Sequence, residues 1–214
     1  AAGKWMFGEN VKFKIMKNAI LLKKYGFSKE KRIETREKLG IEQEEIIYGN
    51  VGRLNVVKNQ LFLVNIFYEI LKKQKRGYLC IVGEGEMREN IVTLSKKLQI
   101  ENRVLLLGNR TDVDELYNAF DCMIFPSIYE GLPISLVEAQ ANGLKCYVSK
   151  DNVPAEVKIL DTLEFIHLEK SACEWADIIV DSDITRDANA TEELRRLNYD
   201  ITMEAKKLAD EYQN

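Results

Sequence analysis

Near the middle of the chain stands the stretch Cys122-Met-Ile-Phe-Pro-Ser-Ile-Tyr-Glu130-Gly-Leu-Pro-Ile-Ser-Leu-Val-Glu138-Ala-Gln-Ala-Asn142. Its first four residues are apolar and predict a buried strand, and the residues from Leu132 onward predict a helix. Gly131 and Pro133 favour a tight turn between the two, because a proline in the first helical turn gives up no hydrogen bond. The stretch therefore has the pattern of one strand–turn–helix unit.

Similar units lie on both sides of this stretch. Apolar strands are predicted at 46–51, 78–82, 104–107, 145–148 and 163–166, and helices at 59–75, 87–98 and 112–119. Strands that are apolar throughout and alternate with helices indicate a parallel sheet covered on both faces. The predicted fold class is α/β, a doubly wound parallel sheet of Rossmann type, in which ligands bind at the carboxyl ends of the strands.

Three segments are predicted along the chain. Residues 1–43 form an interdomain segment, with a short strand at 12–16 and a charged helix at 28–39, and residues 44–185 form the Rossmann-like domain. Residues 186–214 form a charged, helical C-terminal tail. Since the first seven residues resemble the end of a preceding helix, we expect the chain to be part of a larger protein.

The composition is that of a soluble globular domain. Hydrophobic residues make up 46% of the chain, the net charge is −3 and the pI is about 5.5, which argues against a nucleic-acid partner. Three of the four cysteines lie in apolar runs and are expected to be free thiols in a reducing, cytoplasmic compartment. With one histidine, His167, zinc and Ser-His-Asp chemistry are disfavoured.

Two glutamates frame the central turn. Glu130 stands at the mouth of the loop, and Glu138 follows it after seven intervening residues, about two turns along the helix. The helix N-terminus between them offers free N–H groups and the positive end of a dipole, which suit a phosphate. Because carboxylates accept hydrogen bonds from hydroxyl groups, the implied ligand carries both a phosphate and a sugar.

A second polar cluster follows the first strand of the sheet. Arg53 and Lys58 lie in the loop Gly52-Arg-Leu-Asn-Val-Val-Lys-Asn59 and could clamp a diphosphate. Taken alone, they are better explained as two solvated cations before a helix. Their predicted place on the same sheet edge as Glu130 and Glu138 favours the clamp.

Two further motifs carry weaker signals. Gly83-Glu-Gly85 resembles part of a dinucleotide fingerprint but lacks its third glycine, so nicotinamide chemistry is disfavoured and the glycines are expected to permit a tight turn and close approach of a sugar or phosphate. Asp112-Val-Asp114 could hold a divalent metal. The favoured interpretation is a helix cap at Thr111 or Asp112, completed by Asp114 or Glu115, and no metal.

Taken together, these motifs resemble the donor-binding, C-terminal half of family 4 (group 1) retaining glycosyltransferases, which have the two-domain GT-B fold. The resemblance covers about residues 1–180 and is carried by an ordered set of segments: Val51-Gly-Arg-Leu54 with Lys58-Asn59, Val82-Gly-Glu-Gly85, Leu107-Gly-Asn-Arg-Thr-Asp-Val113, Phe125-Pro-Ser127, and Glu130-Gly-Leu-Pro133 through Glu138-Ala139. The last of these is the family's E-x7-E pattern.

The resemblance implies a role for each matching position. Glu130 is the catalytic candidate and lies by the donor hexose, without being assigned as a nucleophile, and Glu138 holds the ribose. The remaining donor-binding positions are Arg53, Lys58 and the backbone N–H groups of Gly131 and Leu132 for the diphosphate, Gly83 and Gly85 for close approach of the ligand, and Asn109, Arg110 and Val113 beside the base. The substrate is a nucleoside-diphosphate sugar, and no cofactor or metal is expected.

The chain also departs from the family pattern. Where members often read Asn-Gly-Ile/Val-Asp, this chain has Asn18-Ala-Ile-Leu21, and the acceptor-binding domain is missing. The resemblance implies transfer to a glycan or lipid-linked acceptor in cell-surface polysaccharide synthesis, by a full-length protein that associates with the inner face of the membrane. The chain alone is expected to be inactive. A nucleotide-sugar-binding module without catalysis and a GT-B epimerase remain as alternatives.

Overall fold

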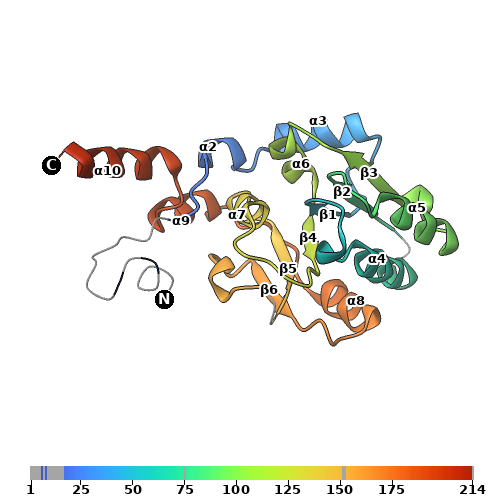
Figure 1. The fold of residues 1–214 in the computed structure, drawn as a ribbon. Coiled ribbons are helices and arrows are strands. Elements are labelled where there is room, and N and C mark those ends of the chain that lie inside the picture. Colours follow the sequence, from blue (N-terminus) through green and yellow to red (C-terminus); the bar gives the residue numbers. More distant parts are fainter. Residues whose placement is uncertain (1–5, 7, 9–16, 75, 151–152, 214) are drawn as a thin grey trace.

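The protein is built on one six-stranded parallel sheet. The computed structural model describes residues 6, 8, 17–74, 76–150 and 153–213. The strand order is β3-β2-β1-β4-β5-β6, with every neighbouring pair parallel (Figure 1). The strands are β1 (Ile47–Val51), β2 (Tyr78–Val82), β3 (Val104–Gly108), β4 (Cys122–Phe125), β5 (Lys145–Ser149) and β6 (Leu163–Ile166). The predicted fold class and all six predicted strands are confirmed.

Helices cover both faces of this sheet. One face carries α4 (Gln60–Gln74), α5 (Arg88–Lys97) and α8 (Ala172–Asp181), and the other carries α3 (Lys29–Leu39), α6 (Val113–Ala119) and α7 (Ile134–Ala141) (Figure 1). The remaining helices are α2 (Leu22–Tyr25), α9 (Ala190–Arg196) and α10 (Ile201–Gln213), with short 3-10 turns at Val56–Lys58, Glu101–Arg103 and Ala155–Val157. Helix α7 begins at Ile134, two residues later than expected, and Pro133 occupies the N-cap position just before it.

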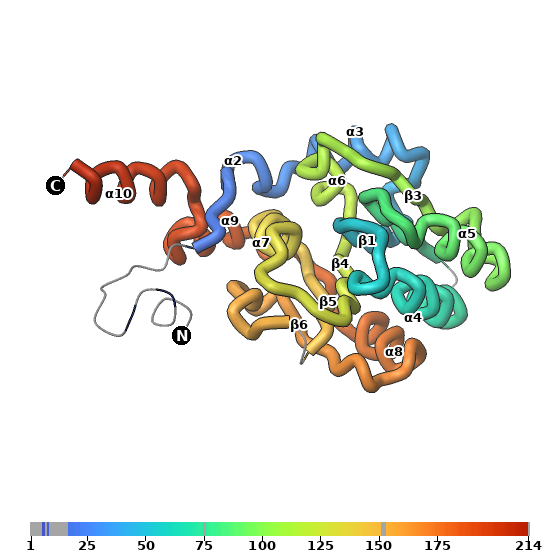
Figure 2. Tube along the Cα trace, viewed as in Figure 1, coloured from blue at the N-terminus to red at the C-terminus, as the bar shows by residue number. Residues whose placement is uncertain are grey.

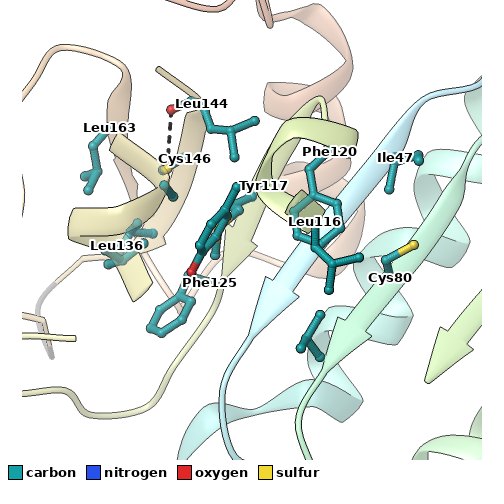
Figure 3. Close-up of a cluster of buried hydrophobic side chains, with 14 of the residues drawn as sticks. Ile47, Cys80, Leu116, Tyr117, Phe120, Phe125, Leu136, Leu144, Cys146 and Leu163 are labelled. Carbon is teal, nitrogen blue, oxygen red and sulfur yellow. Dashed lines mark hydrogen bonds between the residues drawn. The ribbon is translucent and has the colours of Figure 1, made fainter. Parts of the chain in front are cut away.

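Each strand sends alternate side chains to opposite faces of the sheet. In β4, Met123 and Phe125 pack beneath α6 and α7, whereas Cys122 and Ile124 pack beneath α4 and α8. Figure 3 shows part of the first cluster, where Phe120 and Leu136 meet the sheet. Because both faces are buried, apolar residues occupy most strand positions, which is the pattern seen in the sequence. Cys80, Cys122 and Cys146 are buried free thiols, as expected.

A third cluster joins the two ends of the chain to α7. Ile20 forms an isolated parallel bridge with Asp200, and its N–H donates to the Tyr199 carbonyl oxygen at 2.9 Å. Leu22, Val137 and Leu194 are buried together here. Figure 2 shows the segment before α2 lying beside α9.

The expected tail is helical but is divided in two. Helix α9 buries Ala190 and Leu194, whereas α10 buries none of its residues. The strand expected at 12–16 lies outside the described residues. Helix α3 of the interdomain segment packs on α6, and Arg36 of α3 binds Asp121, before β4. The domain boundaries themselves stay predictions.

The topology places one sheet position where a ligand can enter. The chain runs outward from β1 through β2 to β3, then returns to place β4 on the other side of β1. The connections after β1 and β4 therefore diverge, and in such sheets a crevice opens between them at the carboxyl ends of the strands.

The closest packing in the central strand is at Gly49. A Cβ atom added there would lie 2.2 Å from the Phe120 ring. We expect Gly49→Ala to lower the free energy of unfolding by about 1–3 kcal/mol, as overpacking of a core does. Gly131→Ala is the matched control, because a Cβ at Gly131 meets nothing within 4 Å. Urea denaturation of both variants measures the difference, and equal stabilities would contradict the packing argument.

Candidate active site

The connections after β1 and β4 are held together at the crevice. The Ile128 N–H donates to the Val57 carbonyl oxygen at 2.7 Å, and the Asn59 side-chain amide donates to the Pro126 carbonyl oxygen at 3.0 Å. These bonds fix the loop of Lys58 against the loop of Glu130.

Lys58 and Glu130 form a direct ion pair inside this junction. The Lys58 Nζ lies 2.6 Å from the Glu130 Oε1, with 18% of the lysine side chain and 9% of the glutamate side chain exposed. The same ammonium group lies 4.8 Å from the centroid of the Phe125 ring. The sequence assigned the two side chains to different parts of a ligand, and the structure brings them into contact with each other.

Arg53 lies apart from this pair. Its side chain is 72% exposed, and the guanidinium lies 3.7 Å from Glu86 in the loop after β2. Thus Lys58 is held within the protein while Arg53 reaches into solvent at the rim.

Gly83 and Gly85 allow the loop after β2 to contact the loop after β1. A Cβ at Gly83 would lie 2.0 Å from the Gly52 carbonyl oxygen, and one at Gly85 would lie 2.2 Å from the Leu54 carbonyl oxygen. Both glycines also have positive φ, +132° and +157°. Their lack of side chains lets the connections after β1 and β2 touch, and the approach of a ligand to them stays a prediction.

The N-terminus of α7 is open. Pro133 makes no side-chain capping bond, so the N–H groups of the first turn lack the partner that a Ser, Thr, Asn or Asp cap supplies. Gly131 and Leu132, just before the helix, are exposed. A Cβ atom added at Gly131 would have no other atom within 4 Å, so the space beside this residue is open. This helix end can accept an anion.

Glu138 is approached by two tyrosines that the sequence did not single out. The Tyr117 hydroxyl donates to Glu138 Oε2 at 2.8 Å, and the Tyr25 ring packs against the Tyr117 ring with the two centroids 6.1 Å apart. Burial, then the charge of Glu138, raises the pKa of Tyr117, and burial followed by the influence of nearby Glu138 raises the pKa of Tyr25. Both tyrosines occupy core-like positions of short helices, so no sequence signal distinguished them from packing residues.

The segment after β3 differs in detail from the prediction. Asn109 and Arg110 are exposed, and Val113 begins α6. The predicted capping box is wrong: Asp112 occupies the capping position, but its side chain makes no capping bond and instead binds the Arg110 guanidinium, with Nε to Oδ1 at 2.7 Å. The charged fork of Arg110 outcompetes the backbone N–H groups. Asp114 pairs with Lys24 and Lys31.

Most of the chain matches a known family of proteins. A sequence profile described as "Glycosyl transferases group 1" matches residues 31–179. The chain belongs to this family.

Two curated relatives of this glycosyltransferase domain show how far the match extends. The putative glycosyltransferase EpsF of Bacillus subtilis (strain 168) is 31% identical over 183 residues, covering 83% of this chain and 47% of EpsF. The UDP-Gal:alpha-D-GlcNAc-diphosphoundecaprenol alpha-1,3-galactosyltransferase of Escherichia coli is 29% identical, over 70% of this chain and 39% of that protein. The chain thus spans less than half the length of either relative.

A solved structure confirms the fold of the glycosyltransferase domain. HepE from Anabaena, crystallised in complex with UDP, matches with a TM-score of 0.78 at 20% identity, over 94% of this chain and 57% of HepE. The predicted Rossmann-type architecture of one half of a GT-B glycosyltransferase is therefore confirmed.

Two further features of the described residues concern metals and membranes. In the described ranges, no three His, Cys, Asp or Glu side chains gather in a group that could hold a metal ion. Among the described helices of this glycosyltransferase domain, none is long and apolar enough to cross a bilayer.

The Lys58–Glu130 pair is expected to support the site's stability. Lys58→Met leaves Glu130 mostly buried without a counter-charge, which costs about 3–5 kcal/mol of the free energy of unfolding. Lys58→Met/Glu130→Gln removes both charges and should recover part of that loss. Chemical denaturation of Lys58→Met, Glu130→Gln and the double variant, compared with the unaltered chain, completes a double-mutant cycle.

The exposed pair Lys72–Glu69 provides the matched control. Its Nζ–Oε2 distance is 2.8 Å, but the lysine side chain is 55% exposed. We expect Lys72→Met to change stability little, because water screens such a pair. If Lys58→Met lowered the free energy of unfolding no more than Lys72→Met does, the Lys58–Glu130 pair would contribute no more to stability than an exposed pair.

Proposed function

We propose that this domain binds the UDP-sugar donor of a retaining glycosyltransferase that extends a glycan or lipid-linked acceptor. The observation that carries the proposal is the Lys58–Glu130 pair beside the open N-terminus of α7, at the topological switch point of the sheet. One cation, one carboxylate and a helix N-terminus without a side-chain cap lie there, and together they suit a phosphate joined to a sugar.

The diphosphate would lie at the start of α7. The N–H groups after Gly131 face the phosphate oxygens, and Arg53, exposed at the rim, can fold over them. Lys58 already lies against Glu130, so its remaining N–H donors are available to the phosphate. As the bond to the sugar breaks, negative charge develops on the diphosphate, and these fixed donors stabilise it.

The two glutamates then have separate tasks. Glu130, fixed by Lys58, accepts hydrogen bonds from the hydroxyls of the hexose and orients it. Glu138 lies further along α7, where it accepts hydrogen bonds from the ribose. The Asn109–Val113 segment leads from β3 into α6 and flanks the base.

The choice of uridine is supported by what the relatives' names state. The Escherichia coli relative uses UDP-galactose, and the HepE crystals contain UDP. The Escherichia coli enzyme also acts on a diphosphoundecaprenol-linked sugar. We therefore infer a lipid-linked acceptor in cell-surface polysaccharide synthesis, used by a cytoplasmic protein that associates with the membrane surface.

UDP is expected to stabilise the 214-residue chain. At 100 times its dissociation constant it should add about 2.7 kcal/mol to the free energy of unfolding. NAD should add nothing, because the Gly83-Glu-Gly85 motif lacks the third glycine of a dinucleotide fingerprint. Because UDP is expected to bind without a metal ion, the stabilisation by UDP should be the same when EDTA is present. Differential scanning calorimetry makes these comparisons, and no shift with UDP, or one that needs Mg²⁺ or Mn²⁺, would contradict the proposal.

Replacement of the two glutamates should separate their roles. Glu138→Ala weakens UDP and UDP-hexose alike by about 1.5–3 kcal/mol, the usual worth of a hydrogen bond to a charged group. Glu130→Ala mainly removes the preference for UDP-hexose over UDP. Calorimetric titrations with both ligands measure the four affinities, and equal losses for the two variants would refute the assignment.

The chain alone is expected to bind donor without transferring sugar efficiently. The acceptor and donor must be held together, which can contribute about 7–11 kcal/mol to lowering a barrier. This chain spans less than half of its curated relatives. Radiolabelled sugar transfer to membrane acceptors, compared between this chain and the full-length protein, is the measurement. Robust glycan extension by the 214-residue chain would locate the acceptor site within it.

A further inference from the structure

The Glu138 carboxylate is held by the protein before any ligand arrives. Its Oε2 accepts the Tyr117 hydroxyl at 2.8 Å. Tyr25 packs its ring against Tyr117 and lies near enough to Glu138 for the carboxylate to affect its pKa. The two tyrosines come from α6 and from the end of α2, so three helices converge around one carboxylate. Such an arrangement fixes where the carboxylate points.

The Tyr117 hydroxyl cannot easily move away from Glu138. The residue is fully buried, and its ring packs edge-on against Tyr25 and Phe120, with centroid distances of 6.1 and 6.2 Å. The Ser135 carbonyl oxygen also lies 3.2 Å from this hydroxyl. A phenol has a single proton to donate, and the shorter contact to a charged oxygen is the stronger one.

The chemistry of the carboxylate leaves room for a ligand. An ionised carboxylate accepts about four hydrogen bonds, and the Tyr117 hydroxyl uses one of them. In the part of the chain that the structure describes, no Lys, Arg or His nitrogen lies within ion-pair distance of Glu138. Its charge is thus met by a neutral hydroxyl group, and the free acceptor positions suit two further hydroxyls.

We propose that Tyr117 and Tyr25 are positioning residues that orient Glu138 to accept both hydroxyls of the ribose. The inference rests on the proposed function, because it takes the ligand of Glu138 to be a ribonucleotide. Without the tyrosines, the glutamate side chain samples several rotamers, and binding the diol must then order it. The tyrosines therefore raise affinity only for ligands that carry the diol.

The test compares UDP with 2′,3′-dideoxy-UDP, which lacks both hydroxyls. We expect the unaltered chain to prefer UDP by tenfold or more, on the order of one hydrogen bond to a charged group. Tyr117→Phe and Tyr25→Phe should each lower this ratio to about threefold or less, while the affinity for dideoxy-UDP stays unchanged. In a Glu138→Ala background, where the ratio is already near one, neither replacement should lower it further.

Tyr147→Phe is the matched control. Tyr147 is also fully buried but lies in the core on the opposite face of the sheet. Its replacement should leave the ratio at the unaltered value. Circular dichroism checks folding of each variant, and Tyr25→Phe, at a half-buried position, keeps the test open if Tyr117→Phe does not fold.

The outcomes separate the two ideas. If the tyrosine variants keep the full ratio, or lose equal affinity for UDP and dideoxy-UDP, the tyrosines only support packing and this inference falls while the proposed function stands. If the unaltered chain binds no UDP, or binds both nucleotides equally, the proposed ribose site fails and the inference fails with it.

Discussion

The candidate site depends on one ion pair between two loops. Lys58 and Glu130 are 72 residues apart in sequence and meet because β1 and β4 are neighbours at the sheet's switch point. A mostly buried charge requires a counter-charge, so neither loop can move without the other. The open start of α7 follows directly from the Glu130 loop. Its position relative to the loop of Arg53 is therefore set by this contact.

The sheet was predictable because burial on both faces leaves an unmistakable pattern. Strands such as β2 and β4 are apolar throughout, and β2 lies between Gly77 and Gly83. The location of Glu130 and Glu138 followed from the same pattern. Contacts between side chains did not, because a sequence shows which groups are charged but not which lie opposite each other. Lys58 was assigned to a ligand, and Glu130 proved to be its partner within the protein.

Two further differences have physical causes. The capping interpretation of Asp112 failed because Arg110, two residues earlier, offers a charged fork that a carboxylate prefers to backbone N–H groups. The sequence did not indicate a site role for Tyr117, because an aromatic residue on an apolar helix face usually packs in the core. Its hydroxyl acquires significance only when α6 and α7 are placed side by side with Glu138 between them. Both cases concern side-chain pairings that the strand pattern does not encode.

The bridge between Ile20 and the Tyr199–Ile201 segment has a consequence for folding order. It joins residues about 180 positions apart, so the entropy of closing that loop is offset only after the sheet and α9 are in place. We expect this cluster to form late and to open first when the protein fluctuates. Helix α2 follows Ile20 directly and carries Tyr25. The ring that packs against Tyr117, the hydroxyl partner of Glu138, thus comes from the part of the molecule that assembles last.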